Sequence, residues 1–340
     1  MQPLAHRALR PNEHLLSVAD LGPGGVGDVV EHALALKLAA GRPGAGGQDL
    51  AGRHVALLFD KPSLRTRVSF EVGVHRLGGS TTVLSAADVG LGSREPLADI
   101  ARTLSRYVDA IVVRIHDHGQ LCELAAASGV PVVNALTEHE HPCQALADLL
   151  TLREHLGSLR GRRLAYVGDG NNVCHSLLLA GASVGLHVTV GCPPGYEPDP
   201  AVLTVARQLG RATGARVEVV REPIAAVGLA EAIYTDVWTS MGFEREAAER
   251  ERAFAPFQVT ADLLAHAPGA IVLHCLPAHR GHEIDGAVID GPASVVFDQA
   301  ENRLYAQQAV LLRLLHPARA SRPRAALRPL ASAVAGGAHA

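Results

Sequence analysis

FDKPSLRTRVSFE, residues 59–71, is the stretch that decides the local architecture of this chain. The short apolar run RHVALLF leads into it and is typical of a strand. Beyond a Lys-Pro turn, Phe70, Val74 and Leu77 recur with the spacing of one helix face. Ser63 stands between the two segments and is a favourable N-cap residue. The stretch therefore predicts a strand, a tight turn and the start of a helix.

The first turn of this predicted helix is suited to an anion. Backbone N–H groups without helical partners and the positive end of the helix dipole meet at such a start. Two hydroxyl and two guanidinium side chains cluster there: Ser63, Thr66, Arg65 and Arg67. Together they predict a site for a doubly charged anion, most simply a phosphate. An ordinary capped helix with two solvated arginines is the alternative that this stretch leaves open.

Length and composition are those of a globular protein of about two domains. The 340 residues are 48% hydrophobic and 19% charged, with a formal net charge of −3. The sequence has no basic stripe with interleaved aromatic residues, the pattern that would predict nucleic-acid binding. No run approaches the ~18 apolar residues of a membrane helix, and the N-terminal segment lacks the apolar core of a signal peptide. We therefore expect a cytoplasmic protein with no nucleic-acid and no membrane partner.

The cysteines and histidines do not predict a metal site. The five cysteines are scattered and never spaced as Cys-x-x-Cys, which favours reduced thiols over a disulfide frame or a zinc ribbon. Two histidine-rich runs, HDH at residues 116–118 and HEH at residues 139–141, lack the i, i+4 spacing of a helical zinc pair. We expect no metal.

Strand-like and helix-like segments alternate along the chain, which predicts parallel sheets covered by helices on both faces. The first set has predicted strands at residues 54–59, 81–84, 110–113 and 130–134. A long helix starting near Pro142 and a Gly/Ser/Arg-rich segment at residues 157–163 follow it. The second set has predicted strands at residues 163–167, 187–190, 216–220, 232–237, 270–275 and 294–298.

The predicted fold class is α/β, with two doubly wound parallel-sheet domains joined by long helices. We expect residues 1–150 to form the first domain and residues 151–300 the second. The last helix, about residues 301–316, is expected to pack back on the first domain. Residues 317–340 are rich in Ala, Arg and Pro without an apolar periodicity, and we expect a disordered tail there.

Polar motifs follow the predicted strands at their carboxyl ends, where ligands of such sheets bind. These motifs are Arg114, TEHEHPCQ (137–144), GDGNN (168–172), WTSMG (238–242), Cys275-Leu276-Pro277 and Arg303. GDGNN begins like the G-x-G-x-x-G motif with which many oxidoreductases bind a dinucleotide, so that function has to be considered. Val173 stands where the third glycine belongs, which argues against that function.

SLRTR, HPCQ, DGNN, DVWTSMG and HCLP occur in this order, and the chain resembles the transcarbamylase family over about residues 15–315. SLRTR and HPCQ are similar to the family's carbamoyl-phosphate signature, whereas DVWTSMG and HCLP are similar to its ornithine-using branch. The resemblance implies two α/β domains, usually in a homotrimer with active sites between subunits. It implies transfer of the carbamoyl group of carbamoyl phosphate to the δ-amine of L-ornithine, giving citrulline and phosphate without a cofactor.

The resemblance also implies the site residues. The implied catalytic residues are Arg65, Arg114, His141, Asp236 and Cys275. Carbamoyl phosphate would be bound by Ser63, Leu64, Arg65, Thr66, Arg114, His141, Pro142, Cys143 and Gln144. Ornithine would be bound by Asn172, Asp236, Ser240, Met241, Cys275, Leu276 and Arg303.

Two positions depart from the family pattern. Leu64 stands where threonine is usual, so the backbone N–H remains and one hydroxyl is lost. Gly90 stands where a glutamine or histidine usually reaches a neighbouring subunit, so that contact is absent. Two alternatives stay open: a transcarbamylase for another diamine-type acceptor, and a silent homologue that binds carbamoyl phosphate.

Overall fold

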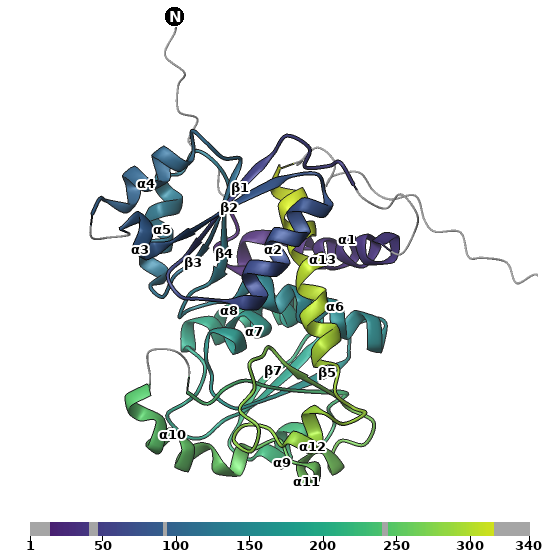
Figure 1. Cartoon of the computed structure of the whole chain (residues 1–340). Helices are drawn as coiled ribbons and strands as arrows, with labels where there is room; N and C mark the ends of the chain where they lie inside the picture. Colours follow the sequence, from purple (N-terminus) through teal and green to yellow (C-terminus); the bar gives the residue numbers. More distant parts are fainter. Residues whose placement is uncertain (1–13, 41–46, 91–93, 240–243, 316–340) are drawn as a thin grey trace, which may run out of the picture.

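The computed structural model of the chain describes residues 14–40, 47–90, 94–239 and 244–315 (Figure 1). Two parallel sheets flanked by helices account for most of these residues. Within this described part, no helix combines the length and apolarity that crossing a membrane requires. The predicted tail at residues 317–340 lies outside the described residues.

The first sheet has four parallel strands in the order β2-β1-β3-β4. Its strands are β1 His54–Phe59, β2 Ser80–Ser85, β3 Ala110–Arg114 and β4 Val132–Leu136. Its helices are α1 Gly25–Ala40, α2 Leu64–Arg76, α3 Ala86–Val89, α4 Leu97–Leu104 and α5 His118–Ala127, with a short 3₁₀ turn at Val18–Leu21 before them. Phe59 pairs with Arg114 in the β1–β3 register, which sets the turn after β1 beside the end of β3.

The second sheet has five parallel strands in the order β7-β6-β5-β8-β9. Its strands are β5 Arg163–Val167, β6 His187–Gly191, β7 Val217–Val220, β8 Ala232–Thr235 and β9 Ile271–His274. Its helices are α7 Asn172–Val184, α8 Pro200–Thr213, α9 Pro223–Val227, α10 Ala247–Phe254, α11 Ala261–Ala265 and α12 Gly286–Ile289, with 3₁₀ turns at Glu244–Glu246 and Ala255–Phe257. The strand order reverses beside β5, which is where ligands of such sheets bind.

Two long helices connect the halves. Helix α6, Pro142–Leu156, leads out of the first sheet, and α13, Val296–Leu315, leads out of the second and packs against α1, α2 and α6 (Figure 1). One apolar cluster runs without a break from Leu57 of β1 through α6 and α7 to Tyr166 of β5. The predicted division at residue 150 falls inside α6, and we propose that the boundary follows this helix.

The structure confirms the α/β class and the two parallel sheets, and it corrects one predicted element. Residues 294–298 are not a strand: Ser294 makes only an isolated bridge to Val272, and α13 begins at Val296. Val296 and Gln299 are buried whereas Phe297 is 69% exposed, which is the spacing of a helix and not the alternation of a strand. A β-branched run of this length fits either structure, and packing against the rest of α13 decides for the helix.

Candidate active site

A cavity of about 550 Å³ lies between the carboxyl ends of the two sheets. The predicted site residues that line it are Ser63, Leu64, Arg65, Thr66, Arg114, His141, Gln144, Asn172, Asp236, Cys275, Leu276 and Arg303. Pro142 and Cys143 are buried at the start of α6 and do not line the cavity. Ser240 and Met241 lie outside the described residues. The cavity therefore has a first wall from the first sheet, α6 and α13, and a second wall from the second sheet.

The start of α2 forms part of the first wall. Ser63 is the N-cap, as predicted, but its side chain makes no capping hydrogen bond, so the hydroxyl is available to a ligand. Arg65 lines the cavity. Arg67 does not: its side chain is 56% exposed and pairs with Glu71 at 3.1 Å. Only one of the two arginines expected in the anion site thus reaches the cavity from this turn.

Two more arginines, the half-buried Arg114 and the buried Arg303, line the same wall. Arg114 ends β3, and burial lowers its pKa to about 10, helped by the charges of Arg303 and Arg65. Arg303 is fully buried, and burial likewise lowers its pKa. Its Nη1 donates to Gln144 Oε1 at 2.6 Å and its Nη2 to Thr66 Oγ1 at 3.1 Å. In the described part of the chain neither Arg114 nor Arg303 has a carboxylate partner, so the first wall carries excess positive charge.

His141 is the N-cap of α6 and is buried in this wall. Burial, with the charges of Arg303 and Arg114, holds its pKa well below the ordinary value. The imidazole is therefore neutral at physiological pH. Its buried Nδ1 has no hydrogen-bond partner among the described residues. A neutral imidazole has one N–H to donate, so it offers a ligand a hydrogen bond without adding charge.

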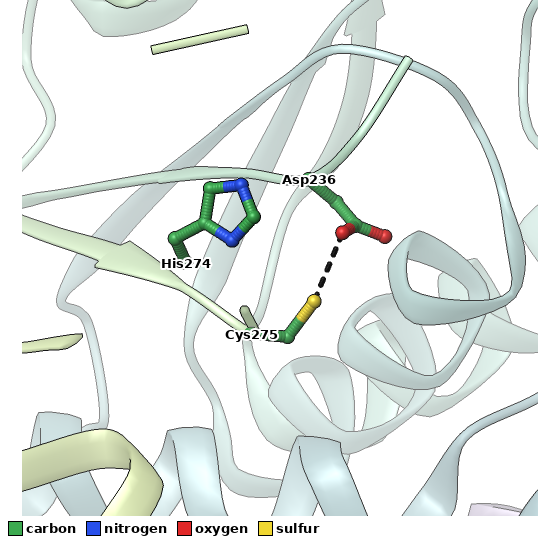
Figure 2. Close-up of side chains that lie close together, drawn as sticks. All are labelled: Asp236, His274 and Cys275. Atoms are coloured by element: carbon green, nitrogen blue, oxygen red, sulfur yellow. Dashed lines mark hydrogen bonds between the residues drawn. The ribbon is translucent and has the colours of Figure 1, made fainter. Parts of the chain in front are cut away.

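The second wall centres on Asp236, which follows β8. Figure 2 shows the Cys275 thiol, at the end of β9, directed at this carboxylate: Sγ lies 2.9 Å from Oδ1. Burial and the negative charge of Asp236 raise the pKa of Cys275 well above its ordinary value, so it is a thiol that donates to Asp236. Asn171 Nδ2 donates to the other oxygen, Oδ2, at 2.8 Å. Both carboxylate oxygens are thus occupied.

The two asparagines of GDGNN have different surroundings. Asn171, which the sequence did not single out, caps α7 through Oδ1 and also bonds Asp236. Asn172, which was expected to bind ornithine, lines the cavity, and its Nδ2 donates to the backbone carbonyl of Thr137 in the first wall. Gly170 is required by packing, because a Cβ there would lie 2.3 Å from Pro198 N. The motif is thus a packed turn and helix cap.

Asp236, His274 and Cys275 also form a cluster whose ligand atoms lie within 4.8 Å of one another (Figure 2). Both ring nitrogens of His274 are already engaged, Nδ1 with the backbone N–H of Leu276 at 2.9 Å and Nε2 with Glu283 Oε1 at 3.1 Å. Only Cys275 and Asp236 are left to a cation, which is fewer than the three or four protein ligands of a zinc site. The donor set does not fit a resident metal.

An ion pair in the second wall was also missed from the sequence. Arg250 of α10 donates to Asp169 Oδ2 at 2.7 Å and to the Trp238 carbonyl at 3.0 Å, and lies 5.0 Å from the Tyr196 ring centroid. Burial raises the pKa of Asp169 to about 6, although Arg250 opposes this shift. Arg250 lies in the charged run ERERA, which resembles a solvated face. Asp169 belongs to the GDGNN motif, and its position shortly after β5 was the sequence signal that could have identified it as a cavity residue.

Comparisons with known proteins agree with this geometry. Residues 13–154 match the carbamoyl-phosphate-binding domain of aspartate/ornithine carbamoyltransferase, and residues 160–314 match its Asp/Orn-binding domain. Ornithine carbamoyltransferase from Acidothermus cellulolyticus is 56% identical over 308 residues, covering 90% of this chain and 97% of that protein. The ornithine carbamoyltransferase from Methanothermobacter thermautotrophicus is 52% identical over 300 residues, covering 88% and 97%.

Solved structures give the same result. Ornithine carbamoyltransferase from Pyrococcus furiosus superposes with a TM-score of 0.84 at 49% identity, covering 88% of this chain and 95% of that one. A variant of N-acetyl-L-ornithine transcarbamylase superposes with a TM-score of 0.80 at 32% identity, covering 88% of this chain and 99% of that one. Since both domains match in order and relatives exceed half identity over nearly the whole chain, this chain belongs to the aspartate/ornithine carbamoyltransferase family, in its ornithine carbamoyltransferase branch.

Proposed function

We propose that this chain transfers the carbamoyl group of carbamoyl phosphate to the δ-amine of L-ornithine, releasing L-citrulline and phosphate. The observation that carries the proposal is the division of the cavity into a cationic first wall and a second wall built on Asp236. The first wall suits a dianion, and the second suits a ligand that carries an ammonium group. Identity above half to relatives named ornithine carbamoyltransferase supports the same pair of substrates.

Carbamoyl phosphate binds the first wall in this proposal. The phosphate takes the N–H groups at the start of α2, the Ser63 hydroxyl and the Arg65 guanidinium. Arg114 reaches both the phosphate and the carbonyl oxygen, and neutral His141 donates to that same oxygen. Gln144 Oε1 accepts from the carbamoyl amide. Donors fixed in a buried wall stabilise the charge that develops on the carbonyl oxygen during attack.

Ornithine binds the second wall with Asp236 facing an ammonium group, and Asn172 and the segment that contains Ser240 and Met241 holding its amino-acid end. The reacting amine is neutral when it attacks, and a lysine-like amine has a pKa of ~10.4, so it first loses a proton. Cys275 does not take that proton, since the raised pKa keeps it a thiol donor. The new C–N bond forms and the C–O bond to phosphate breaks. Of the two protons on the neutral amine, one leaves on the phosphate and the other stays on the nitrogen of citrulline.

Positioning of the two substrates also contributes to the rate of carbamoyl transfer. The two walls hold the two substrates against each other, which turns a bimolecular step into a local one. Leu276, beside Cys275, has a φ of +58°, a left-handed backbone conformation that is strained for a leucine. Such strain at the end of β9 supports a functional role for this turn.

We further propose a closed homotrimer, the usual assembly of the family. The polar, glycine-containing segment around residues 87–95 supports it, because this segment is unsuited to a core. Light scattering should give the mass of a trimer, whereas a fully active monomer would contradict the proposal. The cysteines of the described chain are free, which supports a reducing cytoplasm. The proposed use of ornithine and release of citrulline support a role in arginine metabolism.

A citrulline-forming assay with ornithine and carbamoyl phosphate tests the function directly. We expect turnover that depends on both substrates. A silent homologue would bind carbamoyl phosphate without forming product. An enzyme for another acceptor would release phosphate with a different diamine and little with ornithine.

A further inference from the structure

A chain of buried hydrogen bonds runs behind the cavity from α2 to β9. Its members, all buried, are Thr66, Arg303, Gln144, Asp148, Gln299 and His274. Arg303 donates to Thr66 at 3.1 Å and to Gln144 at 2.6 Å. Gln144 and Gln299 both donate to Asp148, at 2.8 Å and 2.7 Å. The backbone N–H of His274 donates to Gln299 at 2.9 Å. Asp148 stands at the centre and accepts from both sides.

The chemistry of the partners fixes which way the Gln144 amide points. A guanidinium only donates, so Arg303 requires the amide oxygen, Oε1, on its side. Asp148 Oδ1 accepts from Gln144 Nε2 and also from Gln299 Nε2, so it requires the amide nitrogen. Turning Gln144 over would set donor against donor and acceptor against acceptor. The second lone pair of Oε1 then remains for a ligand that donates.

Asp148 has no other evident task. It is 0% exposed, it does not line the cavity, and its Oδ2 has no partner among the described residues. Burial raises the pKa of its carboxyl to about 7, so a charge here is costly. Well-packed apolar residues commonly replace buried ionic groups without loss of stability. Packing alone therefore does not call for a carboxyl at this position.

We propose that Asp148 is a positioning residue for the reaction, because it holds Gln144 with Oε1 toward the carbamoyl amide of carbamoyl phosphate. The inference rests on the proposed function, in which Gln144 accepts from that amide. Asp148 acts through Gln144 and touches no substrate. Inorganic phosphate has no amide, so its binding does not depend on this orientation.

The test compares two ligands by titration calorimetry on the intact protein, with no need for turnover. The titrations are made at pH ~8, above the raised pKa of Asp148, so that the wild-type carboxyl is ionised. In Asp148→Asn that charge is lost, and the side chain can donate as well as accept, so Gln144 is no longer held in one orientation. We expect carbamoyl phosphate to bind roughly 10-fold more weakly, since charge-assisted hydrogen bonds are about twice as strong as neutral ones. Inorganic phosphate should bind within about 2-fold of the wild type, because no broken contact reaches it.

Thr151→Val is the matched control. Thr151 lies one turn further along α6, is equally buried and is bonded to Asn302 of α13 at 2.9 Å, but it does not contact Gln144. We expect it to lower the melting temperature and leave carbamoyl-phosphate affinity unchanged. If Asp148→Asn does not fold, judged by circular dichroism, Asp148→Leu gives the same comparison with the acceptor removed and the space filled, and the larger loss expected of it is roughly 100-fold.

Equal weakening of carbamoyl phosphate and inorganic phosphate in the Asp148 variants would overturn the inference, as would unchanged affinity for both. An effect of Thr151→Val on carbamoyl phosphate of the same size would also overturn it. The proposed function fails by a different result, the absence of citrulline formation by the wild type.

Discussion

The first wall of the cavity holds three arginines, whereas the second wall holds a carboxylate, Asp236, whose hydrogen-bond partners in the described chain are neutral. Arg114 and Arg303 have pKa values lowered by burial, and in the described chain neither has a carboxylate partner. In the second wall, Asp236 already accepts from Cys275 and Asn171. A dianion completes the first wall, whereas a ligand of the second wall must use the lone pairs of Asp236 that Cys275 and Asn171 leave free. The first wall should therefore govern affinity, and the second should govern selection.

The largest effect we expect is acceptor selectivity. Ornithine carries charges at its amino-acid end that the second wall can pair, whereas putrescine lacks that end and N-acetylornithine lacks the α-ammonium. Polar groups left unpaired in a site lower kcat/KM by a factor of ~10⁴ or more. Initial rates with the three amines measure this factor. Comparable kcat/KM for putrescine and ornithine would show that Asp236 does not select the acceptor.

The pH profile sharpens the same point. We expect kcat/KM for ornithine to rise between pH ~6 and ~9, since the attacking amine must lose its proton. The pKa of His141 is held well below the ordinary value, and that of Cys275 well above it, so neither should titrate in this range. A falling profile from pH ~7 to ~9 would mean that a group in the site must stay protonated.

A comparison of alanine variants of Arg65 and Arg67 tests the assignment of the phosphate site to the first wall. Arg65→Ala removes a donor that we assign to the phosphate, and losses of oxyanion-type donors lower the rate by ~10²–10³. Arg67→Ala removes the neighbouring arginine, which pairs with Glu71 outside the cavity, and should change kcat/KM by no more than about 2-fold. Near-normal turnover of Arg65→Ala at low carbamoyl phosphate would refute the assignment.

Two buried arginines, one in each wall, should respond in opposite ways. Arg250→Met leaves Asp169 as an unpaired buried charge and should destabilise the fold by about 3–5 kcal/mol. Arg303→Met removes a cation that has no carboxylate partner in the described chain, so its loss of stability should be smaller and its loss of carbamoyl-phosphate affinity larger. Thermal unfolding and calorimetric titration of both variants measure the two quantities. The reverse ranking in either measurement would contradict the comparison of the walls.

The smallest expected effect is on the pH dependence of stability. The folded pKa of Asp148 is raised from 3.8 to about 7, so the folded state holds this proton more tightly than the unfolded state. Its contribution to stability is thus lost as pH rises through that pKa. Asp148→Asn has no such group, so its melting temperature relative to the wild type should increase by a few degrees between pH ~5 and ~8. A constant difference would mean that Asp148 does not titrate in this range.

Much of the fold was predictable because its signals are local. The strands at residues 54–59 and 163–167 have the predicted bounds, since apolar runs between polar and glycine-containing segments mark them clearly. The prediction of a strand at residues 294–298 was wrong because a short run with β-branched residues fits a strand or a helix start equally well. Strand order was not predicted, since pairing between distant segments leaves no local mark.

The lining of the cavity was predictable where a residue stands at the carboxyl end of a strand, as Arg114 and Cys275 do. It was not predictable where two like residues adjoin: Asn171 and Asn172 differ by one position, and only the turn of α7 decides which one reaches Asp236. Arg250 was missed because its charged segment resembles a solvated surface. Gln299 was missed because it reaches the site only from behind.

The return of α13 to the first half has a consequence for synthesis of the chain. Arg303 belongs to the first wall, yet it is encoded near the end of the sequence, and α13 packs on α1, α2 and α6. Domains generally fold in order as they leave the ribosome. Here the half that is made first must wait for α13, the last helix of the described chain, before its anion site contains all three arginines. A nascent chain that stops short of α13 contains all the strands of both sheets, but its core is unfinished and its binding wall lacks Arg303.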